Sequence, residues 1–235
     1  MLALPGHKHH IESYLARKQL KQPNEKPRNV QPYANETEQE EMVKCHSASI
    51  KYLRSFLDGL AHLGRGRALE VAAGNGIVSR DLLQHKFECI DCFDQCPTAL
   101  RKLEALRRSV PAMDLVDQAT MQSYVWQRHY TGIFLRWCTG YLDDEELVPF
   151  LKKAATFLYS NRARSTRSNG PSAFIFVLDN VLEDGEAPLK VEGQWVRKQS
   201  DLEQLFRQAN LLAHQQTEEI QLHPDFKKTI IWALH

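Results

Sequence analysis

Short apolar runs alternate with amphipathic stretches along most of the chain. From Met42 to Leu60 the apolar residues recur mostly at three- and four-residue steps, which predicts a helix with one buried face. Four apolar runs then predict strands, and the stretches between them carry helical spacing. The predicted strands are Ala68–Ala72, Phe87–Phe93, Gly132–Trp137 and Ala173–Leu178, with a shorter segment at Met113–Val116, and predicted helices begin near Ile77, Pro97 and Asp143. Strands separated by helices favour a parallel sheet covered on both faces.

The carboxy-terminal part departs from this alternation. A helix is predicted over Ser200–Ala209, and two strand-like stretches follow at His214–Leu222 and Lys228–Leu234. Adjacent strands with a short link form an antiparallel hairpin. The sequence therefore predicts an α/β, Rossmann-like fold with a mostly parallel seven-stranded sheet, a C-terminal antiparallel hairpin and helices on both faces.

Length and charge limit the classes of protein to consider. With 235 residues the chain can form one substantial core, so we expect one domain at 38–235 preceded by a basic arm at 1–37. No apolar run approaches the ~18 residues that a membrane span requires. Lys plus Arg number 30 and Asp plus Glu 29, so the positive field typical of nucleic-acid-binding proteins is missing. A nucleic-acid partner is disfavoured, although the arm and a basic stretch at Asn161–Ser172 leave a local patch open.

Cysteine usage bears on the compartment and on metals. Five cysteines, an odd number, in a chain without an apolar leader favour reduced thiols in an intracellular protein. We expect the cytoplasm or nucleus, and the acid-poor arm keeps a mitochondrial presequence open. Cys89 and Cys92, close to Cys96, lie an odd number of positions apart on a predicted strand, so their side chains point to opposite faces. We expect no metal site.

A small-residue turn follows the first predicted strand. Glu70, Ala72, Gly74 and Gly76 form an E-x-A-x-G-x-G arrangement at the junction of strand and helix. Small residues there let a ligand approach the backbone, and the helix N-terminus offers free N–H donors. Asp94 ends the next strand, where a carboxylate can accept hydrogen bonds from a ribose diol. Together these features predict a cofactor containing adenosine, either NAD or S-adenosylmethionine.

The stretch that begins at Trp137 carries a second motif. It follows a Trp-x-x-Gly-His-Leu-x-Asp pattern, with tyrosine in place of the histidine, and then Leu-x-x-Phe-Leu. The matching residues are Trp137, Gly140, Tyr141, Leu142, Asp144, Leu147, Phe150 and Leu151. In this motif, and over roughly Ile50 to Leu234 as a whole, the chain resembles the α-N-terminal protein methyltransferases. Enzymes of that family methylate the exposed amine of proteins that begin with Xaa-Pro-Lys after methionine removal. The resemblance implies a class I methyltransferase fold with S-adenosylmethionine as cofactor.

The resemblance also implies which residues hold the cofactor. Ala72, Gly74 and Gly76 would pass under its methionine part, in the turn that Glu70 begins. Asp94 would hold the ribose. The remaining two predicted cofactor residues are Gln122, near the adenine, and Trp137, in the wall between cofactor and substrate.

Substrate residues are implied in the same way. Asn180 matches an asparagine that holds the substrate amine, and Glu192 falls where the family has a substrate-facing aspartate. Methyl transfer to an amine needs an in-line approach and removal of one proton. Asp179 and Glu192 are the candidate proton acceptors, and Tyr141 is a weaker one.

Several family residues are replaced in this chain. Ile77 stands where the family has an arginine that pairs with the cofactor carboxylate. Loss of such a charge-assisted bond costs ~1.5–3 kcal/mol, or roughly 10- to 150-fold in affinity. Tyr141 replaces a histidine, Leu189 a substrate-facing aspartate, and Lys228 lies near the position of a substrate-binding tyrosine. A Tyr-Trp pair and a Gly-Gly-Tyr lid have no counterpart before Met42.

These observations leave three hypotheses. The first is an S-adenosylmethionine-dependent methyltransferase acting on protein, on an α-amine or a similar group. The second is a catalytically inactive methyltransferase-like scaffold subunit of a larger complex, which the replacements at Ile77 and Leu189 favour. The third is a methyltransferase for RNA or a small molecule, because a fold does not fix its substrate.

Overall fold

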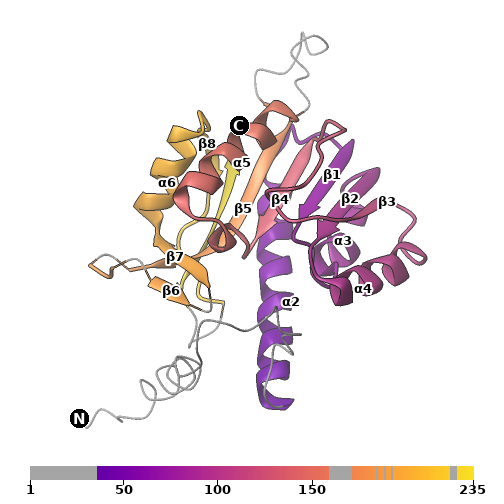
Figure 1. Cartoon of the computed structure of the whole chain (residues 1–235), viewed down its shortest axis with the longest axis horizontal. Helices are drawn as coiled ribbons and strands as arrows, with labels where there is room; N and C mark the ends of the chain where they lie inside the picture. The colour runs from indigo at the N-terminus through magenta and orange to yellow at the C-terminus, as the bar shows by residue number, and fades with distance from the viewer. Residues whose placement is uncertain (1–35, 159–170, 184, 188, 192, 223–226) are drawn as a thin grey trace.

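The computed structural model of the chain describes residues 36–158, 171–183, 185–187, 189–191, 193–222 and 227–235. The described part forms a nine-stranded sheet with helices on both faces (Figure 1). The predicted basic arm up to residue 35 and positions 161–170 of the basic stretch lie outside the described residues.

Five parallel strands form the centre of the sheet, in the order β3, β2, β1, β4, β5. Their bounds are Met113–Gln118, Cys89–Asp94, Arg67–Val71, Gly132–Arg136 and Phe174–Leu182. On the far side of β5, β9 (Thr229–Leu234) runs antiparallel to both β5 and β8 (Ala213–Gln216). This arrangement confirms the predicted class I methyltransferase fold and its antiparallel hairpin.

Two further strands form a ribbon beyond the end of β5. β6 (Leu189–Val191) and β7 (Gln194–Lys198) pair antiparallel, and β7 pairs parallel with Val181 and Leu182 of β5. Without this ribbon the sheet has the seven predicted strands. β7 leads directly into α6 (Gln199–Gln208), which agrees with the predicted helix Ser200–Ala209.

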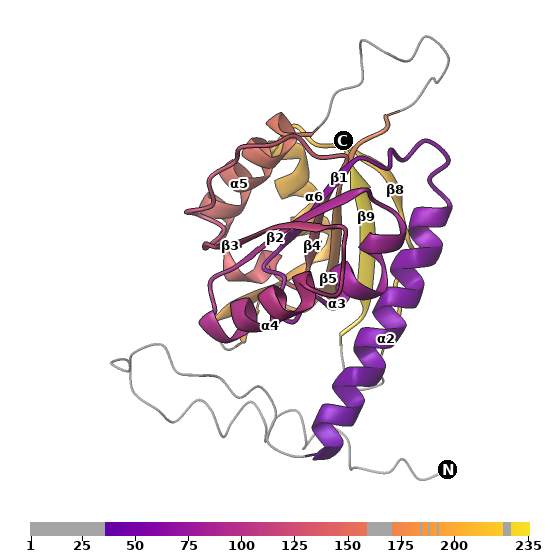
Figure 2. The same ribbon diagram turned by 90° about the vertical axis from the view of Figure 1, so that its right-hand side faces the viewer.

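The helices divide between the two faces of the sheet (Figure 2). α5 (Asp144–Thr156) and α6 bury their apolar faces in one core, together with residues such as Leu69, Ile133 and Trp232. α2 (Glu36–Asp58), α3 (Ile77–Asp81) and α4 (Pro97–Arg107) pack in a second core with Ile90 and Phe134. The 3-10 turns η1 (Leu83–His85) and η2 (Thr139–Tyr141) complete the described elements.

Most strand and helix bounds agree with the sequence pattern to within a few residues. β5 extends four residues beyond the predicted Leu178, so Asp179 and Asn180 lie inside the strand. The predicted strand His214–Leu222 is shorter, because β8 ends at Gln216 and only Ile220 forms a further bridge, to Thr229. α5 begins after Asp143, whose carboxylate accepts a hydrogen bond from the N–H of Glu146 in a capping box.

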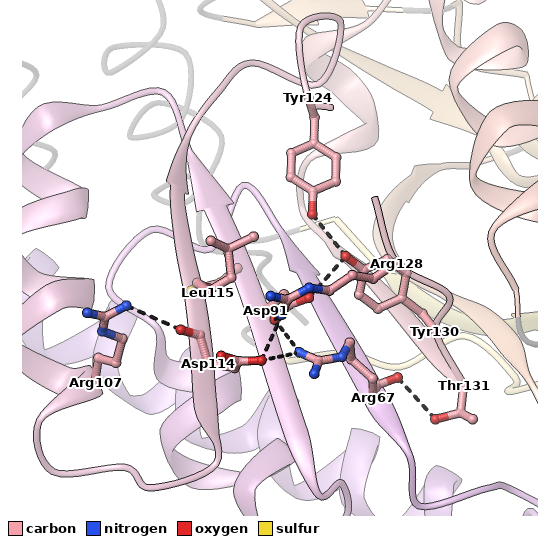
Figure 3. A network of polar contacts seen from close by, with 10 residues as sticks. Arg67, Asp91, Arg107, Asp114, Leu115, Tyr124, Arg128, Tyr130 and Thr131 are labelled. Atoms are coloured by element: carbon pink, nitrogen blue, oxygen red, sulfur yellow. Dashed lines mark hydrogen bonds and ion pairs between the residues drawn. The ribbon is translucent and has the colours of Figure 1, made fainter. Parts of the chain in front are cut away.

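An ion-pair network joins the amino ends of the central strands (Figure 3). The side chain of Asp91 in β2 is fully buried and lies 2.6 Å from Arg67 of β1 and 3.0 Å from Arg128. Both arginines also reach Asp114 of β3. The hydroxyl of Tyr130 donates to Asp91 and shares a hydrogen bond with Tyr124. The network thus connects three strands to the segment before β4.

Two classes of feature are missing from the part of the chain that the structure describes. No helix there is long and apolar enough to cross a membrane. No group of three or more His, Cys, Asp or Glu side chains there is arranged to hold a metal ion.

Replacement of Asp91 should destabilise the fold strongly. Asp91→Ala leaves two arginines and a tyrosine hydroxyl without their buried acceptor, and we expect a loss of about 3–5 kcal/mol in the free energy of unfolding. Asp114→Ala is the matched control, because 46% of the Asp114 side chain is exposed and such pairs contribute about 1 kcal/mol or less. Urea unfolding measures both, and equal losses would contradict this assignment.

Candidate active site

The loop between β1 and α3 turns through an uncommon backbone conformation. Ala72, Gly74 and Gly76 all have positive φ, at 48°, 57° and 67°. At Gly74 an added Cβ would have nothing within 4 Å, whereas at Gly76 it would lie 2.7 Å from Leu106 and 2.8 Å from Leu103. Gly74 therefore faces open space, whereas Gly76 packs closely against two leucines of α4.

Asp94, the last residue of β2, binds this loop. Its Oδ2 accepts a hydrogen bond from the N–H of Gly74 at 2.8 Å, and its Oδ1 accepts one from the N–H of Cys96 at 2.8 Å. A carboxylate has roughly four acceptor positions, so it can accept further hydrogen bonds from a diol. The predicted ribose-binding residue thus lies beside the loop that is predicted to hold the methionine part of the cofactor.

Glu70 is buried beneath the start of α3. Its carboxylate accepts hydrogen bonds from the N–H of Ser79 at 3.0 Å and from the Ser79 hydroxyl. Burial raises the pKa of Glu70 to about 7, and hydrogen bonds from Ser79 and the charge of Arg136 counteract part of that shift. Glu70 therefore anchors α3 to β1. Its place among the cofactor-binding residues stays a prediction.

The predicted adenine side is formed by the segment after β3. Gln122 is exposed there, and its Nε2 donates to Oε1 of Glu146 at 3.2 Å. Phe93 stacks on Tyr124 with ring centroids 4.2 Å apart. The N–H of Ala119 donates to the carbonyl of Asp94, which ties this segment to the end of β2.

Trp137 follows β4 and also has a positive φ, 52°. Non-glycine residues in this conformation are strained and are common at functional sites. Its indole Nε1 is buried and meets no hydrogen-bond acceptor among the described residues. His46 of α2 lies over the indole with ring centroids 5.3 Å apart, and the guanidinium of Arg136 lies 4.3 Å from its centroid.

His46 and Arg136 contact each other as well. Nη2 of Arg136 donates to Nδ1 of His46. Burial, and then the charge of Arg136, lower the pKa of His46 to about 4. The imidazole is thus neutral near neutral pH and accepts from the guanidinium.

Asp179 and Asn180 lie in β5, next to the turn η2. Oδ2 of Asp179 accepts from the N–H and the hydroxyl of Thr139, and Oδ1 accepts from the N–H of Asn180. Burial raises the pKa of Asp179, and the hydrogen bonds from Thr139 oppose this. Oδ1 of Asn180 accepts from the hydroxyl of Thr229 at 2.8 Å, which orients its amide N–H groups away from that bond.

The ribbon also holds η2. Arg197 of β7 is buried, and it donates to the carbonyls of Thr139 and Leu142 and pairs with Asp144 at 2.8 Å. A Cβ on Gly140 would lie 2.4 Å from the carbonyl oxygen of Trp195. Within this tightly held turn Tyr141 remains 51% exposed.

The structure also places the residues that depart from the family pattern. Ile77 is the first residue of α3 and is partly buried against the second core. Leu189 is 42% exposed on β6, and Lys228 forms an ion pair with Glu219. Glu192, the predicted substrate-facing acid, lies outside the described residues.

Most predicted site residues therefore gather at the carboxyl edge of the sheet, as is usual for ligand sites in parallel α/β folds. The sequence analysis missed His46, Arg136, Thr139 and Arg197. Only Arg136 gave a signal in the sequence, because it is a charged residue at the end of an apolar strand. The contacts of the others come from elements far away in the chain.

The fold and this edge define a class I methyltransferase. The chain matches the family of AdoMet-dependent proline dimethyltransferases over residues 42–235, and it belongs to that family. The family prediction, and with it the prediction of S-adenosylmethionine as cofactor, is confirmed.

Relatives and solved structures agree with this assignment. The chain is 29% identical over 168 residues to N-terminal Xaa-Pro-Lys N-methyltransferase 1 of Danio rerio, covering 70% of each protein. It is 26% identical over 184 residues to the protein of the same name of Rattus norvegicus, covering 74% of this chain and 75% of that one. A SAM-dependent methyltransferase from Leishmania major shares the fold, with a TM-score of 0.71 at 20% identity over 81% of this chain and 72% of that one.

The raised pKa of Glu70 predicts a stability that depends on pH. The folded chain holds this proton up to about pH 7, whereas the unfolded chain releases it near the ordinary glutamate pKa of 4.5. The free energy of unfolding should therefore fall as pH rises through this window, by up to about 3 kcal/mol. Glu70→Gln lacks this contribution, and the exposed Glu104→Gln is the matched control. Urea unfolding across the window should show a wild-type decline that Glu70→Gln lacks; parallel curves would refute it.

Two alanine substitutions should separate packing from ligand contact. Gly76→Ala meets Leu103 and Leu106 and should lower the free energy of unfolding by about 2–4 kcal/mol. Gly74→Ala points into open space and should cost about 1 kcal/mol, yet weaken S-adenosylhomocysteine binding by about tenfold or more. Thermal unfolding and calorimetry measure the two effects, and unchanged ligand affinity in Gly74→Ala would exclude the loop as the cradle.

Proposed function

We propose that this protein is an S-adenosylmethionine-dependent methyltransferase that methylates the α-amine of a protein or peptide N-terminus. The observation that carries the proposal is the open side of Gly74 next to the carboxylate of Asp94. This combination fits a cofactor that contains adenosine. The ribose diol donates hydrogen bonds to a carboxylate, and the rest of the cofactor passes over a backbone that carries no side chain there. The buried Nε1 of Trp137, with no acceptor among the described residues, fits a site completed by a ligand.

The residues at this edge divide between the two ligands. Ala72, Gly74, Gly76 and Asp94 would hold the cofactor, Gln122 would approach the adenine, and Glu70 would fix the loop. When bound, the cofactor supplies an electrophilic methyl group to the amine. The chain's own residues need to orient that amine, exclude water and accept one proton.

An α-amine has a pKa near ~8, so a sizeable fraction is neutral at physiological pH. Positioning is then the larger task for the protein. Asn180 would hold the amine by accepting one of its N–H groups at Oδ1, which has a second acceptor position beside the one that the hydroxyl of Thr229 occupies. Asp179 already accepts three hydrogen bonds, so its first role would be to fix Thr139 and Asn180. Glu192 and Tyr141 remain the other candidates for the proton.

The proposal includes the cellular compartment and the limits of the domain. All five cysteines are free thiols, which suits a reducing compartment such as the cytoplasm or nucleus. The boundary between arm and domain near residue 37 and the substrate being a protein remain predictions. The relatives in zebrafish and rat carry names of N-terminal protein methyltransferases, which supports this substrate class.

Cofactor binding followed by methyl transfer tests the proposal. Titration calorimetry with S-adenosylhomocysteine should give micromolar affinity, and Asp94→Asn, which keeps one acceptor oxygen for the loop, should bind about tenfold or more weakly. Methyl incorporation should then be found with peptides that begin Xaa-Pro-Lys and not with the same peptides acetylated at the N-terminus. Binding without transfer would favour the scaffold hypothesis, and no binding up to millimolar ligand would refute the proposal.

A further inference from the structure

S-adenosylmethionine carries an amino-acid carboxylate at the end opposite its adenosine. A partly buried carboxylate is bound well only where a cation or several N–H donors meet it. α3 begins with the uncharged Ile77, so its first residue cannot provide the cation. Resting on the proposed function, we propose that Arg136 is the residue that binds the carboxylate of the cofactor in this protein.

The register of the sheet places Arg136 beside the loop between β1 and α3. β1 and β4 pair in parallel with Val71 opposite Leu135. Continuation of this register by one residue sets Arg136 beside Ala72, the first residue of the loop. Because side chains alternate along a strand, Arg136 points to the same face as Phe134, the face that carries α3.

The contacts of Arg136 hold its guanidinium in this place. It lies 4.3 Å from the ring centroid of Trp137, and Nη2 donates to Nδ1 of His46. The imidazole is neutral near neutral pH. It therefore orients the guanidinium and leaves the positive charge of Arg136 available to a ligand. That charge reaches Glu70 beneath α3, since it opposes the rise in the pKa of Glu70. The charge of Arg136 therefore acts on the residue that anchors the loop.

Lys102 of α4 is the rival cation. Its ammonium donates to Oδ1 of Asn75 in the same loop, at 3.1 Å. Lys102 is exposed, so solvent and salt screen its interaction with a ligand more than that of the partly buried Arg136. A guanidinium can also bind a carboxylate through two parallel N–H groups, which an ammonium cannot.

Two ligands separate this role from a general effect on the site. S-adenosylhomocysteine carries the carboxylate, and 5′-methylthioadenosine keeps the adenosine and the thioether but has no amino acid. Calorimetry on the full chain should show that Arg136→Gln binds S-adenosylhomocysteine about 10- to 150-fold more weakly and binds 5′-methylthioadenosine within about threefold of the wild type. Arg101→Gln, the same change on the exposed surface of α4, should alter neither affinity.

Two more variants keep the test decisive. Arg136→Lys retains the charge and most of the volume, and should show a smaller loss confined to S-adenosylhomocysteine even if Arg136→Gln does not fold. Ile77→Arg combined with Arg136→Gln should restore part of that affinity, because it places a cation at the start of α3.

The outcomes are distinguishable. Failure of the wild type to bind either ligand would overturn the proposed function, and this inference with it. A wild type that binds both, with Arg136 variants that lose both affinities equally or neither, would overturn this inference alone. A loss selective for S-adenosylhomocysteine in Lys102→Gln and not in the Arg136 variants would assign the role to Lys102 instead.

Discussion

A buried carboxyl group determines the shape of the sheet edge at which the ligands are expected to bind. Glu70 reaches from β1 to the N–H and hydroxyl of Ser79, and this bond determines where α3 begins. The intervening residues must then turn tightly, which explains the positive φ of Ala72, Gly74 and Gly76. Asp94 holds the same loop from β2. Two buried carboxylates from neighbouring strands therefore shape one short loop.

The second half of the site is organised by the turn η2. Asp179 of β5 accepts from the N–H of Thr139, and Arg197 of β7 donates to the carbonyls of Thr139 and Leu142. A buried arginine with these partners is tolerated because each of its three nitrogens donates to an acceptor, one of them a carboxylate. Arg197 thus connects the ribbon to η2 and to the start of α5.

The sequence could predict the strands, because strands buried on both faces appear as apolar runs, and the loop, because its backbone demands small residues. It could not predict the ribbon, since Leu189–Val191 and Gln194–Lys198 are short, partly polar and paired only with the extension of β5. His46 and Arg136 were missed for a related reason. They lie 90 positions apart and meet only through the packing of α2 on the sheet.

Gly140 and Tyr141 are neighbours with opposite freedom to vary. The α-carbon of Gly140 lies against the backbone of β7, where no side chain fits, whereas the ring of Tyr141 is half in solvent. Mutational drift in this protein's lineage can therefore explore position 141 while position 140 stays closed to it. The shape of the turn is inherited rigidly, and the chemistry that it presents to a substrate can evolve one residue at a time.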